Sequence, residues 1–188
     1  MFKVVMGVIA GLALANVARA AEPPRYLPNH DVAITYRTTG TDPALPPRII
    51  VRYFAAGDRL RIDGGPIGYL LVDRAMERVE LVMPQPKLVL EMPPGGGLTD
   101  TFILGPDLAF RAVGMDHALG RACMQYDVTI NRAHGRVCLS PDGLLLRGEG
   151  RGADGRAATI EAVAVSMAAQ PAGLFSPPDT YSYIETPK

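Results

Sequence analysis

Apolar and polar side chains alternate with a period of two along most of this chain. Val32, Ile34 and Tyr36 fall on one side of such a run, and Leu60 and Ile62 fall on one side of another. Because successive side chains of a β-strand point to opposite faces, this pattern predicts strands that are buried on one face. Gly, Pro, Asn and Asp separate the runs and predict turns. The predicted strands cover residues 32–37, 49–53, 59–63, 69–73, 79–83, 87–92, 109–113, 122–130, 136–140, 144–148 and 157–167.

This series predicts a mainly β fold, an antiparallel meander of about ten strands. A twisted open sheet of more than about ten strands curls. We therefore expect a curved half-barrel with an apolar concave face. At most one short helix is expected over that face, within residues 98–108, where Gly105-Pro106 interrupts it. Residues 157–167 also fit helical spacing, so both types of element stay open for them.

The first twenty residues are typical of a signal peptide. Lys3 is followed by the uncharged, mostly apolar run Val4–Val17, and Ala18-Arg19-Ala20 matches an A-x-A cleavage site. A membrane anchor is the alternative, but this run, at about 1.5 Å per residue in a helix, is too short for a hydrocarbon core of about 30 Å. We expect cleavage after Ala20, export to the periplasm and no remaining transmembrane anchor. A Pro-rich leader, residues 21–30, would then precede a single domain, residues 31–188.

The composition argues against two classes of protein. Hydrophobic residues make up 48% of the 188 residues, which argues against intrinsic disorder. Lys+Arg and Asp+Glu are equal at 19 each, so the chain lacks the excess of positive charge that a nucleic-acid partner normally requires. The 20 glycines and 17 prolines disfavour long helices.

The chain has 2 cysteines, Cys123 and Cys138. In an oxidising compartment such a pair is most simply a disulfide, because the spacing is not C-x-x-C and no Cys/His quartet surrounds the pair. Direct pairing across one hairpin would centre the turn between Ile130 and Asn131, whereas the turn residues point to a centre near Ala133. We therefore expect a bulge or a diagonal bridge.

Motifs for catalysis and cofactors form no consistent site. Gly150–Gly155 matches G-x-G-x-x-G, but dinucleotide binding needs this turn between a strand and a helix of a βαβ unit, and the surrounding pattern favours a hairpin. His30-Asp31 and Asp116-His117 could each supply two metal ligands, with surface histidines as the simpler interpretation. We expect no metal, no cofactor, no catalytic residue and no enzymatic activity.

Charged residues beside the predicted strands have simple structural interpretations. Arg52, Arg59 and Arg61 alternate with apolar neighbours and most simply face solvent, although one that faced inward would suit an anionic head group. The carboxylates at strand ends suit turn caps, and an acid/base pair among them would need pKa values pushed apart by burial. These carboxylates are Asp58, Asp63 and Asp73.

The apolar face carries the strongest functional signal. Methionine is flexible and polarizable, so a surface that contains it suits varied apolar ligands. A closed and filled core is the alternative interpretation of the same residues. The side chains expected to line the concavity are Tyr36, Tyr53, Leu60, Ile62, Tyr69, Leu71, Leu81, Met83, Leu90, Met92, Phe110, Met124, Tyr126 and Val128.

The order and spacing of these segments resemble the LolA/LolB/LppX-like superfamily of bacterial periplasmic carriers, in particular its secreted branch. The resemblance implies a curved antiparallel sheet with a helical lid over an apolar cavity for acyl chains, in a protein that transfers lipids or lipoproteins without catalysis. The chain departs from the family in having no Trp and a Pro-interrupted helical segment, so no acyl-binding residue is carried over. The resemblance extends over residues 31–184 and rests on Arg59–Asp63, Tyr69–Asp73, Val79–Met83, Lys87–Met92, Gly120-x-x-Cys123-x-x-Tyr126-x-Val128, Val137–Leu144 and Leu174-Phe175-x-x-Pro178.

These observations lead to one function and one alternative. The first is a non-enzymatic periplasmic protein that binds or carries an acyl chain, a lipid or a lipoprotein. The alternative is an interaction module of the cell envelope with a filled core, which docks a protein partner through a sheet edge or through the loop at residues 92–99.

Overall fold

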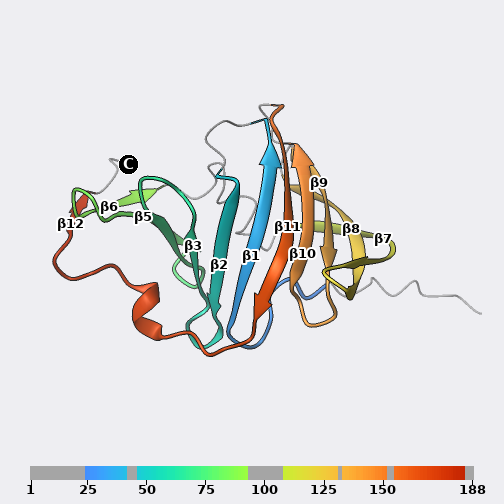
Figure 1. Cartoon of the computed structure of the whole chain (residues 1–188), viewed down its shortest axis with the longest axis horizontal. Helices are drawn as coiled ribbons and strands as arrows, with labels where there is room; N and C mark the ends of the chain where they lie inside the picture. The colour runs from blue at the N-terminus through green and yellow to red at the C-terminus, as the bar shows by residue number, and fades with distance from the viewer. Residues whose placement is uncertain (1–23, 42–45, 93–107, 131–132, 152–154, 185–188) are drawn as a thin grey trace, which may run out of the picture.

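The computed structural model describes residues 24–41, 46–92, 108–130, 133–151 and 155–184. They contain one twelve-stranded sheet in the order β12-β6-β5-β4-β3-β2-β1-β11-β10-β9-β8-β7 (Figure 1). The strands are β1 (Val32–Gly40), β2 (Arg48–Phe54), β3 (Arg59–Asp63), β4 (Tyr69–Asp73), β5 (Arg78–Met83), β6 (Leu88–Met92), β7 (Ala109–Ala118), β8 (Arg121–Ile130), β9 (Ala133–Leu139), β10 (Leu145–Arg151), β11 (Ala157–Ser166) and β12 (Ser182–Ile184). Two 3-10 helices, η1 (Ala55–Gly57) and η2 (Ala172–Phe175), complete the described elements.

The sheet is curved and open, with β7 and β12 at its edges within the described part of the chain. Neighbouring strands are antiparallel, except that β12 runs parallel to β6. The first strand pairs with both β2 and β11, so it joins the meander β1–β6 to the meander β7–β11. The predicted fold class is therefore confirmed, with twelve strands in place of about ten.

One face of the sheet carries a continuous apolar core. Tyr36 of β1 lies opposite Ile49 of β2, and Val51 lies opposite Ile62 of β3, so these side chains share a face. Buried residues of β8–β11 belong to the same cluster. Strands β3 and β8 are far apart in the sheet order, so their side chains can share one cluster only if the sheet curves toward this face. This face is therefore the concave one. The hydroxyl of Tyr36 donates a 2.8 Å hydrogen bond to the carbonyl oxygen of Leu145 and links β1 to β10 across the core.

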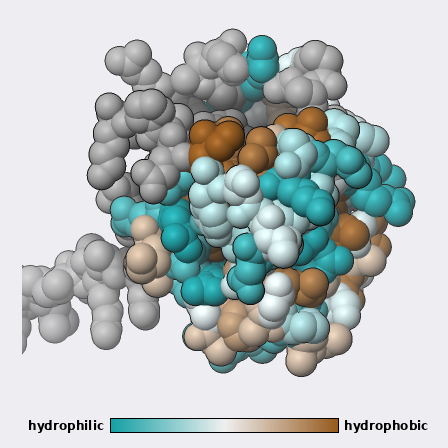
Figure 2. All heavy atoms as spheres, turned by 90° about the vertical axis from the view of Figure 1, so that its left-hand side faces the viewer, coloured by the Kyte–Doolittle hydropathy of each residue, from teal (hydrophilic) through white to brown (hydrophobic). Residues whose placement is uncertain are grey.

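The C-terminal segment covers part of the convex face. Leu71, Val82 and Val89 form a second buried cluster there, against which Tyr69 and Tyr181 pack. The segment then reaches the sheet edge, where β12 pairs with β6. Figure 2 shows this edge of the molecule as a mixture of hydrophilic and hydrophobic residues.

The side chain of Phe175 anchors this segment. It is 4% exposed, and its ring stacks on Phe54 at 5.5 Å between centroids. Arg61 donates a 3.2 Å hydrogen bond to the carbonyl oxygen of Leu174 and lies 3.6 Å above the ring of Tyr69. The convex face is therefore buried where this segment crosses it.

The eleven predicted strands are present, with two differences in detail. Residues 157–166 form β11, so the strand interpretation of this segment is confirmed and the helical alternative is not. Strand β7 continues to Ala118, beyond the predicted end at Val113, because a bulge between Ala112 and Gly114 breaks the alternation that marks a strand. Strand β12 was not predicted, because three exposed residues carry no hydrophobic period. The short helix expected within residues 98–108 and most of the loop at 92–99 lie outside the described residues.

The Gly150–Gly155 motif begins in β10, and its last residue, Gly155, precedes the antiparallel strand β11; residues 152–154 lie outside the described part of the chain. Strand β10 pairs with β11, and Arg151 lies opposite Ala157 at the end of the pair. This arrangement is the predicted hairpin, and it differs from the strand-to-helix turn that dinucleotide binding needs.

The disulfide between Cys123 and Cys138 joins β8 to β9, with the two Cα atoms 5.4 Å apart. Cys138 lies opposite Gln125 in the strand register, so the bridge runs diagonally, as expected. Ile130 lies opposite Ala133, which centres the turn between the two predicted positions. Both cysteines are buried.

Replacing both cysteines, Cys123→Ala with Cys138→Ala, is expected to lower the free energy of unfolding by about 3 kcal/mol, because the bridge closes a loop of about 15 residues in the unfolded chain. Chemical denaturation followed by far-ultraviolet circular dichroism measures the change. Wild-type protein under reducing conditions should show the same loss. An unchanged denaturation midpoint in both samples would contradict the prediction.

Candidate functional site

The concave face has a floor of fully buried side chains. Tyr36, Tyr53, Leu60 and Ile62, all predicted to line the concavity, are 7% exposed or less and belong to the main core. They come from the three neighbouring strands β1, β2 and β3. These side chains therefore support the site, and their surfaces are already occupied by one another.

Half-buried apolar side chains continue this face on both sides of the floor. On β5 and β6, Leu81 lies opposite Leu90, and the neighbouring Met83 and Met92 point to the same face. On β7 and β8 the corresponding side chains are Phe110, Met124 and Tyr126. We call these two groups the β5–β6 wall and the β7–β8 wall.

Aromatic rings connect the β7–β8 wall to the leader. Phe110 meets Tyr126 edge to face at 5.7 Å and stacks on Tyr26 at 5.9 Å. Phe110, Tyr126 and Met92 all pack against the main core while keeping part of their surface exposed. Both walls are therefore continuous with the floor.

Two residues of the predicted set lie on the opposite face. Tyr69 and Leu71 point to the convex side, where Leu71 is buried under the C-terminal segment. Their neighbours Leu70 and Val72 point to the concave side, opposite Ile62 and Leu60. The four consecutive apolar residues of β4 show no alternation, so the sequence pattern alone does not distinguish the two faces.

The described interior is closely packed beside the leader. A cavity of about 40 Å³ lies between Tyr26, Leu27 and Pro28 on one side and the floor on the other. Sites for small molecules are usually about 300–1,000 Å³, and one water in the liquid takes about 30 Å³. In this conformation the cavity therefore has no room for an acyl chain.

Polar groups border this closed end. The hydroxyl of Tyr53 donates a 3.0 Å hydrogen bond to Asp58, and Asp58 forms a 2.8 Å ion pair with Arg74. Burial, together with the negative charge of Asp58, raises the pKa of Tyr53 to about 12. Arg74 also contacts the hydroxyl of Tyr26 at 3.4 Å. The sequence did not predict this network, because Asp58 and Arg74 lie in two different turns and Tyr26 lies in the leader, all outside the strand that carries Tyr53.

A second, open groove of about 700 Å³ lies along β7–β11, at the ends of the strands next to the β8–β9 turn. Asp127 sits there between Arg111 and Arg136 and pairs with both. The hydrogen bond from Arg136 lowers the pKa of Asp127 and keeps the carboxylate ionised. Arg111, Arg136 and Arg151 line this groove together with Asp127 and Glu149, so positive groups are in slight excess along it.

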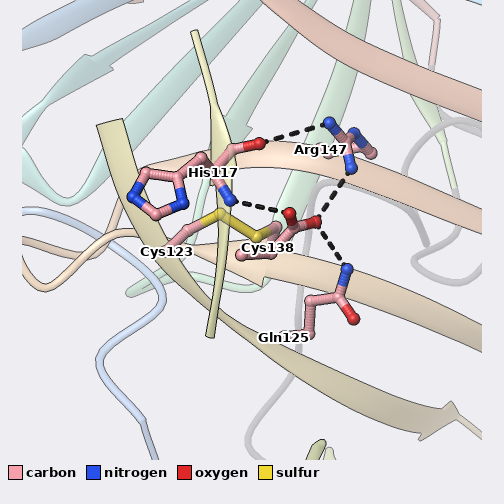
Figure 3. A network of polar contacts seen from close by, with 6 residues as sticks. His117, Cys123, Gln125, Cys138 and Arg147 are labelled. Atoms are coloured by element: carbon pink, nitrogen blue, oxygen red, sulfur yellow. Dashed lines mark hydrogen bonds and ion pairs between the residues drawn. A yellow bond between two sulfur atoms is a disulfide. The ribbon is translucent and has the colours of Figure 1, made fainter. Parts of the chain in front are cut away.

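The pair Asp116-His117, which was considered as possible metal ligands, belongs to a network of hydrogen bonds beside the disulfide (Figure 3). Asp116 accepts hydrogen bonds from the backbone N–H of His117 at 2.7 Å, from Gln125 at 2.6 Å and from Arg147 at 3.0 Å. These donors, the His117 N–H first, lower the pKa of Asp116. Within the described residues, no three His, Cys, Asp or Glu side chains gather as a metal site.

The other pair, His30-Asp31, also has structural contacts. His30 Nε2 lies 3.1 Å from the sulfur of Met167. The carboxylate of Asp31 accepts hydrogen bonds from the backbone N–H groups of Ala55 at 2.9 Å and of Gln170 at 2.8 Å. Asp31 therefore ties the start of β1 to η1 and to the segment after β11.

The arginines considered for an anionic head group lie on the convex face. Arg59 donates to Asp73 at 3.1 Å, and Arg61 donates to Asp63 at 2.9 Å. Arg52 also pairs with Asp63. Asp73 accepts a hydrogen bond from the backbone N–H of Met76 as well, as expected of a carboxylate that caps a turn.

Comparisons with known proteins find a similar fold and no close relative in sequence. No protein-family model and no curated protein match the chain. The solved structure of PNGF-II matches with a TM-score of 0.52 and 14% identity over 83% of this chain and 31% of PNGF-II, so the chain spans about a third of that protein. MucB matches with a TM-score of 0.48 and 14% identity over 84% of this chain and 60% of MucB.

A LolA-superfamily protein from Nitrosomonas europaea matches with a TM-score of 0.42 and 11% identity, over 81% of this chain and 92% of that protein. A protein of the superfamily named in the sequence analysis is thus one of the matched structures. The described part of the chain contains no helix that is long and apolar enough to cross a membrane.

A buried carboxylate lies on the convex face beside the second apolar cluster. Glu80 of β5 is 5% exposed and lies between Leu71 of β4 and Glu91 of β6 in the register. Arg78 approaches it at 3.4 Å. Burial is the main cause that raises the pKa of Glu80.

A carboxyl group whose pKa is raised on folding stabilises the protein below its unfolded pKa, and this contribution is lost as the pH rises through the folded pKa. The neutral variant Glu80→Gln is therefore expected to be more stable than the wild type at pH 7 and to lose this advantage near pH 4. Denaturation midpoints at several pH values measure the difference. Glu149→Gln, which changes an exposed glutamate on β10, is the control. A loss of stability in Glu80→Gln at pH 7 would contradict the prediction.

Proposed function

We propose that this protein binds an apolar or amphipathic molecule, such as the acyl chain of a lipid or lipoprotein, on the concave face of its sheet. It acts without catalysis, in the periplasm, after cleavage behind Ala20. The observation that carries this proposal is the presence of two half-buried apolar walls on one face of an open, curved sheet. The buried disulfide supports an oxidising compartment.

The walls have the chemistry that a flexible apolar ligand requires. Removal of apolar surface from water contributes about 25 cal/mol per Å², so a chain laid along both walls gains affinity from area and not from a specific polar contact. Met83, Met92 and Met124 adapt their shape to different chains, because methionine is unbranched and polarizable. The aromatic pair Phe110 and Tyr126 adds a flat, rigid surface.

The proposal predicts binding of the fluorophore 1-N-phenylnaphthylamine and its displacement by palmitate. Met92→Asn and Met124→Asn each put a polar group on one wall and are expected to weaken binding by about tenfold, which corresponds to about 1.4 kcal/mol. Met76→Asn is the matched control, because Met76 is 68% exposed in a turn. Fluorescence titration of the delipidated protein measures the affinities. Equal affinities in all three variants would contradict the assignment of the walls.

A second function is favoured by the exposed edge strand β7. Val113, Met115 and Leu119 of β7 and its turn are 47%, 64% and 41% exposed. An edge strand with apolar side chains can accept a strand from a protein partner. MucB has been solved in complex with MucA, but for this chain the second function rests on the exposed residues of β7 alone.

These two functions are separated by Leu119→Lys, because Leu119 lies in the turn after β7 and not beside a wall residue. An interaction module that docks through β7 and its turn would lose its envelope partner in a pull-down with this variant, while Met92→Asn would still bind that partner. A ligand-binding protein would bind the fluorophore with unchanged affinity after Leu119→Lys. The same two variants therefore give opposite results for the two functions.

A further inference from the structure

The leader in front of β1 packs into the concave side of the sheet. None of its described residues, from Pro24 to His30, is part of a strand. Tyr26 and Leu27 pack against the main core, and Pro28 is buried. The small cavity described above is lined by these three residues together with floor residues of β1, β2 and β3.

Side chains on two sides of the leader contact the ring of Tyr26. On one side Tyr26 stacks on Phe110 of the β7–β8 wall. On the other side the guanidinium of Arg74 lies 5.7 Å from the ring of Tyr26 and is itself held by Asp58. The tyrosine ring therefore fills a gap between a turn that follows β4 and a wall of the candidate site.

The leader also makes a close backbone contact at Gly143. This residue has φ +88, and a Cβ atom there would lie 2.7 Å from the carbonyl oxygen of Leu27. Glycine adopts this left-handed conformation freely and leaves room for the leader backbone. The turn between β9 and β10 therefore receives Leu27 without a side chain in the way.

We propose that Tyr26–Pro28 is a displaceable plug that occupies one end of the apolar site and competes with the acyl chain for it. This inference rests on the proposed function. The plug contributes apolar side chains to the site from the same chain, and its removal adds the volume of a tyrosine and a leucine side chain to the 40 Å³ cavity. The ligand replaces aromatic and aliphatic contacts with contacts of the same kind.

The arrangement suits exchange because the plug is held by side-chain contacts and not by strand pairing. Its polar contact to the rim is the 3.4 Å hydrogen bond from Arg74 to Tyr26. A ligand that binds only the open form has an apparent dissociation constant equal to its intrinsic value divided by the open fraction. Weakening the plug therefore increases affinity, whereas truncating an ordinary lining residue decreases it.

The test compares the mature wild type with the double variant Tyr26→Ala/Leu27→Ala. The double variant is expected to bind 1-N-phenylnaphthylamine about tenfold more tightly, because the open fraction rises. Asn29→Ala, which changes an exposed residue of the same leader, is expected to bind as the wild type does. Adding Met92→Asn to the double variant should weaken binding again, which places the fluorophore on the walls.

Three outcomes are distinguishable. Tighter binding by the double variant supports the plug. Equal or weaker binding by a double variant that unfolds cooperatively overturns the plug and leaves the proposed function standing. Absence of binding in every protein overturns the proposed function and the plug with it.

A second measurement on the wild type does not depend on the variants. The nuclear Overhauser contact between the rings of Tyr26 and Phe110 should be lost when the fluorophore is added, because the ligand displaces the leader. Retention of this contact, with fluorophore bound, would overturn the plug.

Discussion

The buried side chains of β1 hold the two halves of the sheet together, because β1 pairs with both β2 and β11. Val32, Ile34 and Tyr36 point to the concave face and contact side chains from both meanders. The hydroxyl of Tyr36 is satisfied by the carbonyl oxygen of Leu145, so a large polar group is accommodated at the centre of an apolar core. This packing forms the floor, and the two walls continue the same face on either side of it.

The segments at the two ends of the described chain bury apolar side chains that the strands alone leave exposed. The C-terminal segment covers Leu71, Val82 and Val89 on the convex face and protects the β6 edge through β12. The leader covers the opposite, concave face at Tyr26 and Leu27. These ends differ in attachment: the C-terminal segment ends in strand pairing, whereas the leader is held by side chains. This difference is why we assign exchange with a ligand to the leader.

Much of the fold was predictable from the sequence because most strands are buried on one face and alternate accordingly. Prediction of the face failed in β4, where Tyr69, Leu70, Leu71 and Val72 are all apolar because both faces are covered. The contacts of the leader were not predicted either. Tyr26 contacts Phe110 and Arg74, which lie far from it in the sequence. Periodicity describes one strand at a time and carries no information on such contacts.

Binding of an apolar molecule on the concave face can be examined by native mass spectrometry of the protein purified from the cells that produce it. We expect a species heavier than the disulfide-bonded protein by the mass of a lipid or lipoprotein, and loss of this excess mass after extraction with organic solvent. A single species at the bare mass of the disulfide-bonded protein before extraction would refute the proposed function.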